Sequence, residues 1–381
     1  MPWQEVSMMT LKEEFVGKAQ AAGANMSALC RAYGISRKTG YKWLKRYEGQ
    51  GPAGLVEQSR RPLHSPGRTR QAVEQWVLEA RAAHPAWGGR KLKRWLTDRG
   101  YPDIPAESTI TEILRRHGQL DAGESQKHRA HTRFEMPEAN QLWQMDFKGY
   151  LSLPDGKRCY PLTITDDHSR FLVALRACPN ESQALVRQQL TATFEGFGLP
   201  QRMLMDNGNP WGDLSNGRRA FTQLEVWLMR LGIRVSHGRA YHPETQGKVE
   251  RLHRTLKAEL LSCTPFWTWD DLQPAFDAWR DLYNLQRPHE ALHLAPPVTG
   301  YHPSPRPFPH ALPPITYPAD MLVRKVDSAA HLWLHNRRFK VGKAFSGLPV
   351  GLRPDPFTDG LFHVFFCDTL IRTLDLRQPV P

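Results

Sequence analysis

The spacing of hydrophobic residues follows a helical period over the first 120 residues of this 381-residue chain. Leu11–Ala22 and Met26–Tyr33 each show one apolar side at 3.6-residue spacing, and Gly34 ends the second stretch. Ser36 is expected to cap a third helix that runs to Tyr47. Two short helices joined by a glycine turn form the layout of a helix-turn-helix unit, which we place over residues 1–58.

The third predicted helix combines an apolar side with long cationic side chains. Such side chains can contact DNA phosphates and guanine edges, so this segment is the expected recognition helix. An ordinary solvated basic helix would have a similar composition. The predicted DNA-binding residues here are Arg37, Lys38, Lys42, Lys45 and Arg46.

A second run of helical spacing follows a linker rich in Gly, Pro and Arg. It predicts helices over 70–83 and 89–99, and a third that Ser108 caps and that ends near residue 117. We expect a second helix-turn-helix DNA-binding domain over 66–120, with Arg115 and Arg116 as DNA contacts, and a linker over 121–137.

The pattern becomes strand-like between residues 138 and 300, with helical segments interspersed. The order of elements, βββαβαβα plus one further helix, predicts an α/β domain with a mixed sheet. The strands are expected at 142–153, 158–165, 171–177, 202–205 and 233–236, and the helices at 182–197, 219–231, from 246, and at 269–284.

Proline is dense from Pro296 to Pro318, which predicts a stiff linker. Five short strand patterns follow in residues 319–381, at 332–334, 337–341, 350–353, 361–366 and 370–374. Short strands at close spacing are typical of a small β-barrel, so we predict an SH3-like one.

Charge is distributed unevenly along the chain, whose formal net charge is +13. Residues 1–135 carry +9, residues 136–300 carry zero and residues 301–381 carry +4. Basic ends around a neutral middle indicate a polyanionic partner such as DNA. No apolar run approaches the roughly 20 residues of a membrane helix, so we expect a soluble, intracellular protein without a membrane partner.

Metal-binding patterns of cysteine and histidine are missing from the sequence. The five cysteines are scattered and none forms a CxxC pair, so neither a disulfide framework nor a zinc site is expected. His237, His242 and His253 lack the paired spacing of zinc ligands.

Three acidic residues stand where chemistry needs them. Asp146 lies inside an apolar strand, where an unpaired carboxylate is costly. Asp206 ends a later strand, and ligands gather at strand ends of α/β sheets. Glu250 lies on a helix, at the edge of its apolar stripe. Asp166 and Asp167, near another strand end, are expected to form a turn.

The helix that carries Glu250 also carries cations. Lys248, Arg254 and Lys257 are predicted to contact DNA phosphates. A plain surface pair between Glu250 and Arg254, worth about 0.2–0.5 kcal/mol, is the simpler alternative for this helix.

Four sequence segments together resemble one enzyme family. WQMDF, MDNG, HPETQGKVERLHRTLK and YNLQRPHEAL, in this order, resemble the Asp-Asp-Glu core of retroviral-integrase-type transposases in bacterial insertion sequences. The resemblance implies an RNase H-like integrase catalytic core over 138–300. It also implies that Asp146, Asp206 and Glu250 are both the catalytic residues and the metal ligands.

The same resemblance implies a reaction and its partners. Two Mg²⁺ ions, replaceable by Mn²⁺, would be bridged by Asp146 and completed by Asp206 and Glu250, with no zinc. A DNA transposase of this kind binds the terminal inverted repeats of double-stranded element DNA, frees 3′ hydroxyls and joins them to target DNA. Assembly of two or more copies on DNA, at the nucleoid in the cytoplasm, is implied as well.

One departure from the family pattern leaves alternatives open. Asp206 and Glu250 are separated by 43 residues, more than in the retroviral pattern, and the surplus is expected in Asn209–Arg219. Glu244 is therefore a rival for the third ligand, although it precedes the helix and rigid elements hold sites better than loops. A catalytically inactive helix-turn-helix regulator and a plain RNase H-like nuclease are the other function classes.

Overall fold

The computed structural model describes residues 8–57, 68–120, 135–208, 210–212, 220–238, 247–263 and 267–378. The chain divides into two compact units at Arg68 and Thr69. Within the described residues, no helix combines the length and apolarity that a bilayer crossing requires.

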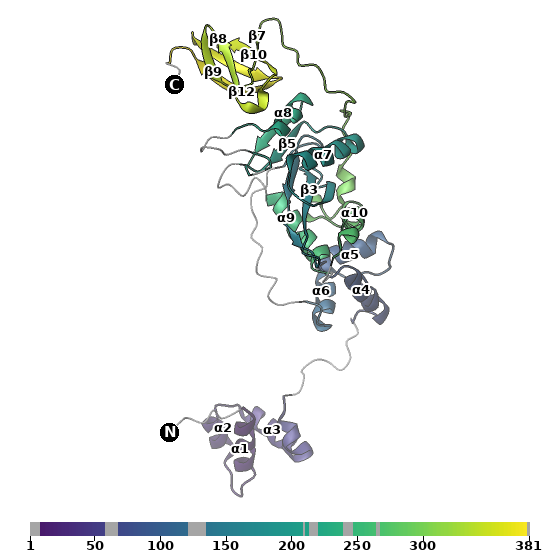
Figure 1. The fold of residues 1–381 in the computed structure, drawn as a ribbon. Helices are drawn as coiled ribbons and strands as arrows, with labels where there is room; N and C mark the ends of the chain where they lie inside the picture. Colours follow the sequence, from purple (N-terminus) through teal and green to yellow (C-terminus); the bar gives the residue numbers. More distant parts are fainter. Residues whose placement is uncertain are drawn as a thin grey trace. The chain divides into compact units, whose positions relative to one another are not determined.

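The first unit contains three helices around a small apolar centre (Figure 1). Phe15 and Val16 are fully buried there, and Trp43 and Leu44 pack against them. Ser36 caps the third helix, as predicted, by accepting a hydrogen bond from the Thr39 backbone amide. The elements are α1 (Met8–Ala19), α2 (Met26–Ala32), α3 (Arg37–Gln50) and the short 3₁₀ helix η1 (Gly51–Leu55).

The second unit begins with another three-helix cluster. Its helices are α4 (Gln71–Ala83), α5 (Gly89–Asp98) and α6 (Glu107–Arg116). Their apolar sides enclose Trp87, Leu92 and Ile110. The predicted Ser108 cap is wrong, because α6 already starts at Glu107 and Ala106 holds the N-cap position. Pro105 is the sequence signal for this start, because the residue before a proline avoids the helical conformation and a helix can begin only after it.

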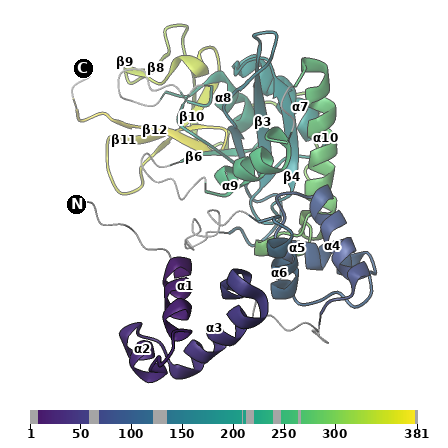
Figure 2. The ribbon, with the colours of Figure 1, turned by 90° about the horizontal axis from the view of Figure 1, so that it is seen from below.

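A mixed sheet with helices on both faces forms the middle of the chain (Figures 1 and 2). The strand order is β2-β3-β1-β5-β6, and β4 also pairs with β3. Strand β3 pairs antiparallel with β1, β2 and β4, whereas β1, β5 and β6 run parallel to one another. The strands are β1 (Trp143–Phe147), β2 (Leu151–Ser152), β3 (Arg158–Asp166), β4 (Leu172–Cys178), β5 (Arg202–Met205) and β6 (Arg234–His237).

Two apolar layers cover the two faces of this sheet. On one face, α7 and α8 pack Phe194 and Trp227 against Trp143 of β1. On the other, α9 and α10 pack Leu256 and Phe276 against β3 and β4. The helices are α7 (Gln183–Phe197), α8 (Gln223–Arg230), α9 (Gly247–Leu256) and α10 (Trp269–Leu285). A five-residue π-helical turn, η5 (Lys257–Leu261), directly continues α9.

The single strand expected over 142–153 is divided in the structure. It becomes β1 and the two-residue β2, with Gly149 between them at a φ of +84°. A left-handed backbone angle suits glycine and interrupts an extended strand.

The proline-rich segment lies against the core rather than bridging open space. Tyr301 stacks on Phe171 with a ring separation of 4.0 Å. The Arg306 guanidinium donates hydrogen bonds to the carbonyls of Pro200 and Leu231. Two 3₁₀ turns, η6 (Glu290–Leu292) and η7 (Pro297–Gly300), precede these contacts.

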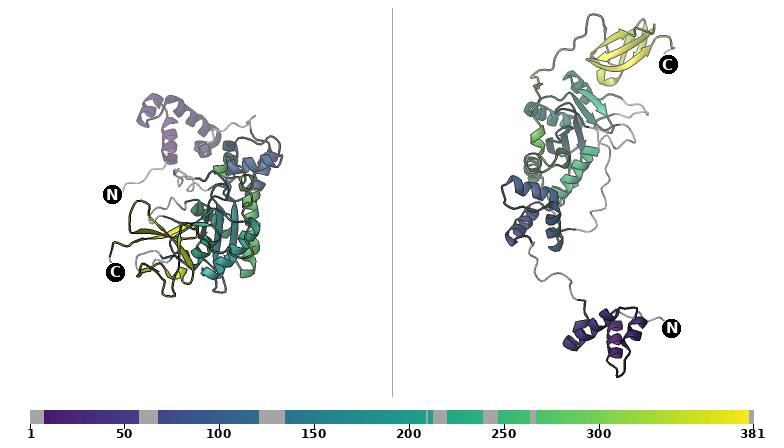
Figure 3. Two further views of the ribbon diagram at one scale, coloured as in Figure 1. Left: turned by 90° about the horizontal axis from the view of Figure 1, so that it is seen from above. Right: turned by 180° about the vertical axis from the view of Figure 1, so that it is seen from behind.

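The C-terminal strands, yellow in Figure 3, pair as two sheets that do not close into one, so the predicted SH3-like barrel is not confirmed. The four-stranded sheet has the order β12-β11-β10-β7, and β8 pairs with β9 alone. The first strand escaped prediction because all four of its residues are exposed and give no alternating pattern. The strands are β7 (Leu322–Lys325), β8 (His331–Leu334), β9 (Arg337–Lys340), β10 (Pro349–Pro354), β11 (Leu361–Phe366) and β12 (Thr369–Asp375).

A short 3₁₀ turn, η8 (Lys343–Phe345), connects these sheets to the core. Phe345 packs edge-on against Phe221, and Val226 and Met229 of α8 share its apolar cluster. The C-terminal strands therefore use the outer side of α8 as part of their own core.

Candidate active site

The parallel pairing of β1 with β5 brings two of the predicted acids together. Gln144 stands opposite Leu204 in this ladder. Extended by two residues in each chain, this register aligns Asp146 with Asp206, which directly follows the end of β5. Because alternate residues of a strand point to the same side and Asp206 directly follows β5, we expect the carboxylates of Asp146 and Asp206 to leave the same face of the sheet.

Burial and mutual repulsion act together on Asp146. Its side chain is 24% exposed and lies between the buried Met145 and Phe147. Burial raises the pKa of Asp146 to about 7, and the negative charges of Asp206, Glu181 and Glu250 also raise it. A carboxylate in this setting favours a proton or a cation as its counterpart.

Asp206 is held through its backbone as well as its side chain. Its carbonyl accepts a hydrogen bond from Nδ1 of His237, the last residue of β6, at 2.6 Å. The other ring nitrogen of His237 lies 2.9 Å from the fully buried Glu225 carboxylate of α8. The Gly208 amide donates to Asp206 Oδ1 at 3.0 Å. Burial raises the pKa of Asp206, while that amide and His237 oppose the rise.

His253 and Thr163 form a hydrogen-bonded pair directly beside Asp146. The Thr163 hydroxyl donates to the Asp146 carbonyl at 2.9 Å and lies 2.8 Å from His253 Nε2. Because a hydroxyl has a single proton, it must accept from Nε2–H if it donates to the carbonyl. Nδ1 of His253 is then the bare nitrogen, 3.9 Å from Asp146 Oδ2. Burial first, and then Lys148, lower the pKa of His253 to about 3.

Glu250 lies one helical turn before His253 on α9, and it is exposed. Arg254 and Lys257 are exposed on the same side, at positions i+4 and i+7 from it. No ion pair joins Glu250 to Arg254 within the described part of the chain, so the simple surface pair is not formed there. The rival acid, Glu244, lies outside the described residues, as does most of the expected surplus loop.

Lys248 is paired with a carboxylate inside the protein. Its ammonium lies 2.6 Å from Asp167 Oδ1, and its side chain is 17% exposed. Asp167 also accepts from Gln144 and from the Met136 amide. Asp166 accepts from the amide and the hydroxyl of Ser169, which closes the expected turn. Both aspartates are fully buried and satisfied, and Lys248 anchors the start of α9 to Asp167.

The donor set at this site consists of carboxylate oxygens. Oxygen ligands of this kind suit Mg²⁺ or Mn²⁺, and the raised pKa values of Asp146 and Asp206 fit a site made for a cation. Among the residues that the structure describes, no three His, Cys, Asp or Glu side chains stand close enough together to hold a metal ion.

The family models match the chain in several places. Integrase core domain models match residues 136–243 and 231–297. Helix-turn-helix and homeodomain-like domain models match residues 11–62 and 39–114. The C-terminal domain model of IS481-family transposases matches residues 321–380. The chain resembles an insertion-sequence transposase with an integrase core.

Two relatives of this transposase-like chain come from insertion elements. The uncharacterized 39.2 kDa protein of insertion element IS476 from Xanthomonas euvesicatoria is 27% identical, over 65% of this chain and 69% of that protein. The uncharacterized 31.7 kDa protein of insertion element IS407 from Burkholderia multivorans is 27% identical, over 41% of this chain and 54% of that protein. This chain thus matches just over half of the second relative.

A solved structure, the catalytic core domain of HTLV-2 integrase in complex with magnesium, also aligns with the transposase-like chain. It covers 44% of this chain and 99% of that one, at 16% identity and a TM-score of 0.34. A score this low adds nothing to the family models.

The predicted DNA-binding residues of the two helix-turn-helix units differ in their exposure. On α3 the side chains of Arg37, Lys38, Lys42 and Lys45 are exposed, and Arg46 is half-buried. The arginines at the end of α6 are engaged: Arg115 pairs with Glu112, and Arg116 pairs with Glu74, whose side chain is buried.

Three residues beside the site escaped the sequence interpretation. Glu181, just before α7, has a pKa raised by burial and by Asp206, so it is a further acid near the site. The sequence spacing of His237 and His253 argued only against a zinc site and gave neither residue a role beside the acids. The available sequence signals were the position of His237 at the end of a strand and that of His253 one helical turn after Glu250.

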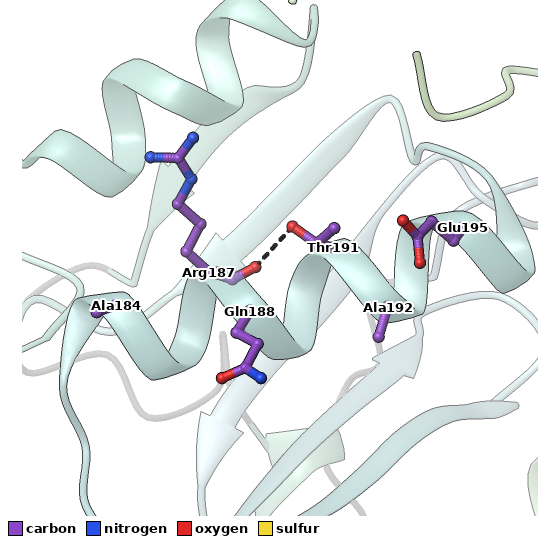
Figure 4. A pocket seen from close by; sticks show the side chains of 6 residues that line it. All are labelled: Ala184, Arg187, Gln188, Thr191, Ala192 and Glu195. Atoms are coloured by element: carbon purple, nitrogen blue, oxygen red, sulfur yellow. Dashed lines mark hydrogen bonds between the residues drawn. The ribbon is translucent and has the colours of Figure 1, made fainter. Parts of the chain in front are cut away.

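The open hollow along the outer side of α7 is unrelated to these acids (Figure 4). Its six lining residues all belong to α7, and the Thr191 hydroxyl is satisfied by the Arg187 carbonyl at 2.9 Å. A shallow surface on one helix with no converging polar groups is not an active site.

Proposed function

We propose that this chain is a DNA transposase that binds the terminal inverted repeats of a mobile element, cleaves there to free 3′ hydroxyls and joins them to target DNA. The observation that supports the proposal is the parallel pairing of β1 with β5, whose register, extended past the end of β5, aligns Asp146 with Asp206; the charge of Glu250 on α9 also raises the pKa of Asp146. The match to integrase core domains and to helix-turn-helix domains supports the same conclusion.

Asp146, Asp206 and Glu250 would hold the metal. Two Mg²⁺ ions, or Mn²⁺ in their place, would supply Lewis-acid stabilisation of the attacking and leaving oxygens of an in-line displacement at phosphorus. The raised pKa of Asp146 supports this use, because the cluster of acids favours a positive counterpart.

The residues around the acids would orient them and the DNA. His237 fixes the Asp206 backbone, and Thr163 fixes that of Asp146. Arg254 and Lys257, exposed beside Glu250, would contact phosphates next to the scissile bond. The exposed cations of α3 would bind the element ends in a groove of double-stranded DNA. Two or more copies would assemble on paired ends, at the nucleoid.

A joining assay tests the proposal. The full chain is incubated with Mg²⁺, a labelled duplex from the inverted repeat that flanks the coding sequence, and a supercoiled target plasmid. The expected result is 3′-end cleavage and insertion into the plasmid, abolished by EDTA and by Asp206→Asn. Binding without cleavage in either Mg²⁺ or Mn²⁺ would favour a catalytically inactive regulator. Cleavage of any duplex without joining would favour a plain nuclease.

A further inference from the structure

The π-helical turn that continues α9 carries a buried glutamate with two partners from distant parts of the chain. Glu259 Oε1 accepts a hydrogen bond from the indole nitrogen of Trp87 at 3.1 Å. The same oxygen accepts one from Arg287 Nε at 2.8 Å. The Glu259 and Arg287 side chains are each only 7% exposed. Wide helical turns of this kind are rare and frequently occur at functional sites.

Trp87 belongs to the core of the α4–α6 helix-turn-helix unit. It is 1% exposed, and His84 stacks on it at 3.8 Å with nearly parallel rings. Its backbone carbonyl accepts from Arg81 at 2.7 Å. The indole is therefore fixed within that unit, and its N–H leaves the unit to reach Glu259.

A second bond crosses the same junction, and other cations surround it. Arg99 donates to Gln286 Oε1 at 2.7 Å, next in sequence to Arg287. Lys91 of α5 lies close enough for Arg287 and Glu259 to act on it, and burial lowers its pKa to about 8. A buried ion pair of this kind is costly to break from one side, because the remaining charge is left without a partner.

Helix α9, which carries Glu250, and its continuation η5 are thus anchored along their length. Lys248 attaches its start to Asp167, and His253 attaches its middle to Thr163. Glu259 attaches its continuation to the helix-turn-helix unit. Glu250 and Glu259 are nine residues apart on one continuous helical segment.

We propose that Glu259 is a positioning residue that couples DNA binding by the α4–α6 unit to the placement of Glu250. DNA that orders this unit also restrains Trp87, and through Glu259 it restrains the helix on which Glu250 lies. The two sites are then linked by a shared element whose order both affect. This inference rests on the proposed function, since it takes DNA as the ligand of α4–α6.

Trp87→Phe removes the N–H donor and keeps an aromatic ring in the core. Trp95→Phe is the matched control, since Trp95 belongs to the same cluster and its buried indole nitrogen has no hydrogen-bond partner within the described residues. Glu259→Gln retains an acceptor for Trp87, whereas Glu259→Leu does not.

Hydrogen exchange of the amides in residues 247–263 gives a readout that is independent of catalysis. Full-length proteins are compared with and without the inverted-repeat duplex, without metal. Without DNA, these amides should exchange about 5- to 10-fold faster in Trp87→Phe than in wild type, because one buried hydrogen bond is lost. Their exchange in Trp95→Phe should match that in wild type. The duplex should slow exchange in wild type, Trp95→Phe and Glu259→Gln. It should slow exchange far less in Trp87→Phe and Glu259→Leu.

Equal exchange in Trp87→Phe and Trp95→Phe, with and without DNA, would overturn the inference while leaving the proposed function intact. A wild-type chain that binds the duplex no better than unrelated DNA would instead refute the proposed function. In that case the comparison of the free proteins still decides whether Trp87 restrains α9.

Discussion

The Nδ1 atom of His253 lies 3.9 Å from the Oδ2 atom of Asp146, and the opposite ring nitrogen lies 2.8 Å from the Thr163 hydroxyl. The hydroxyl in turn donates to the Asp146 carbonyl. This arrangement turns an unprotonated nitrogen toward the first acid of the site. There it can accept a hydrogen bond from a water molecule or a protonated carboxyl group, and it repels a second bare oxygen.

His253→Leu should reduce DNA joining by about tenfold or more, because it removes the partner of Thr163 and the acceptor beside Asp146. Binding to the inverted repeat should stay within about twofold of wild type. Thr163→Val, which removes only the hydroxyl, should have a smaller effect in the same direction. Joining and gel-shift assays on the three proteins measure this, and full joining activity of His253→Leu would show that the ring only fills space.

Asp146→Asn should melt at a temperature equal to or above that of wild type in EDTA, and it should be inactive in joining. Burial and neighbouring acids raise the pKa of Asp146 to about 7 in the folded chain, above the unfolded value of about 3.9. Its contribution to stability is therefore present below about pH 4 and is lost as pH rises through about 7. The melting difference between variant and wild type should grow over that interval and level off above it.

The effect of Mg²⁺ on the two melting temperatures tests whether Asp146 binds a metal ion. A ligand that binds only the folded state raises the melting temperature by mass action, so Mg²⁺ should stabilise wild type more than Asp146→Asn. Thermal melts of both proteins from pH 4 to 8, with Mg²⁺ or EDTA, measure both effects. A variant several degrees less stable than wild type in EDTA would identify Asp146 as a satisfied structural acid.

Glu250→Gln should abolish joining and leave end binding intact, whereas Glu244→Gln should retain most activity. Glu250 lies on α9 one turn before His253, and its charge acts on Asp146. Removal of one metal-binding carboxylate affects the chemical step far more than DNA affinity. The opposite pattern in a gel-based joining assay would transfer the role to Glu244.

Lys42→Ala should weaken binding to all duplexes and lower the slope of log affinity against log salt by about one, as expected for one lost phosphate contact. Lys42 is exposed on α3. Arg115→Ala, whose guanidinium pairs with Glu112 on α6, should change that slope less. A salt titration of the full-length proteins measures the slopes, and equal slopes for wild type and Lys42→Ala would remove Lys42 from the interface.

Local sequence patterns predicted most of the order of helices and strands. The Ser36 cap, the apolar stripe of α9 and the β–α alternation of the core follow from periods and caps within a few residues. The family segments likewise marked Asp146, Asp206 and Glu250. Where local signals were weak, prediction failed: Gly149 divided one expected strand, and the exposed β7 went unseen.

Only the tertiary structure decided which residues distant in sequence lie next to one another. The parallel register of β1 and β5, extended past the end of β5, aligns Asp146 with Asp206, although 59 residues separate them in sequence. The contacts of Thr163 with His253 and of Trp87 with Glu259 span 90 and 172 residues. Five of the six C-terminal strands were visible in sequence, but their division into two sheets was not. A period reports which side of an element is apolar, whereas partners across the fold depend on register and packing between elements, which no local pattern contains.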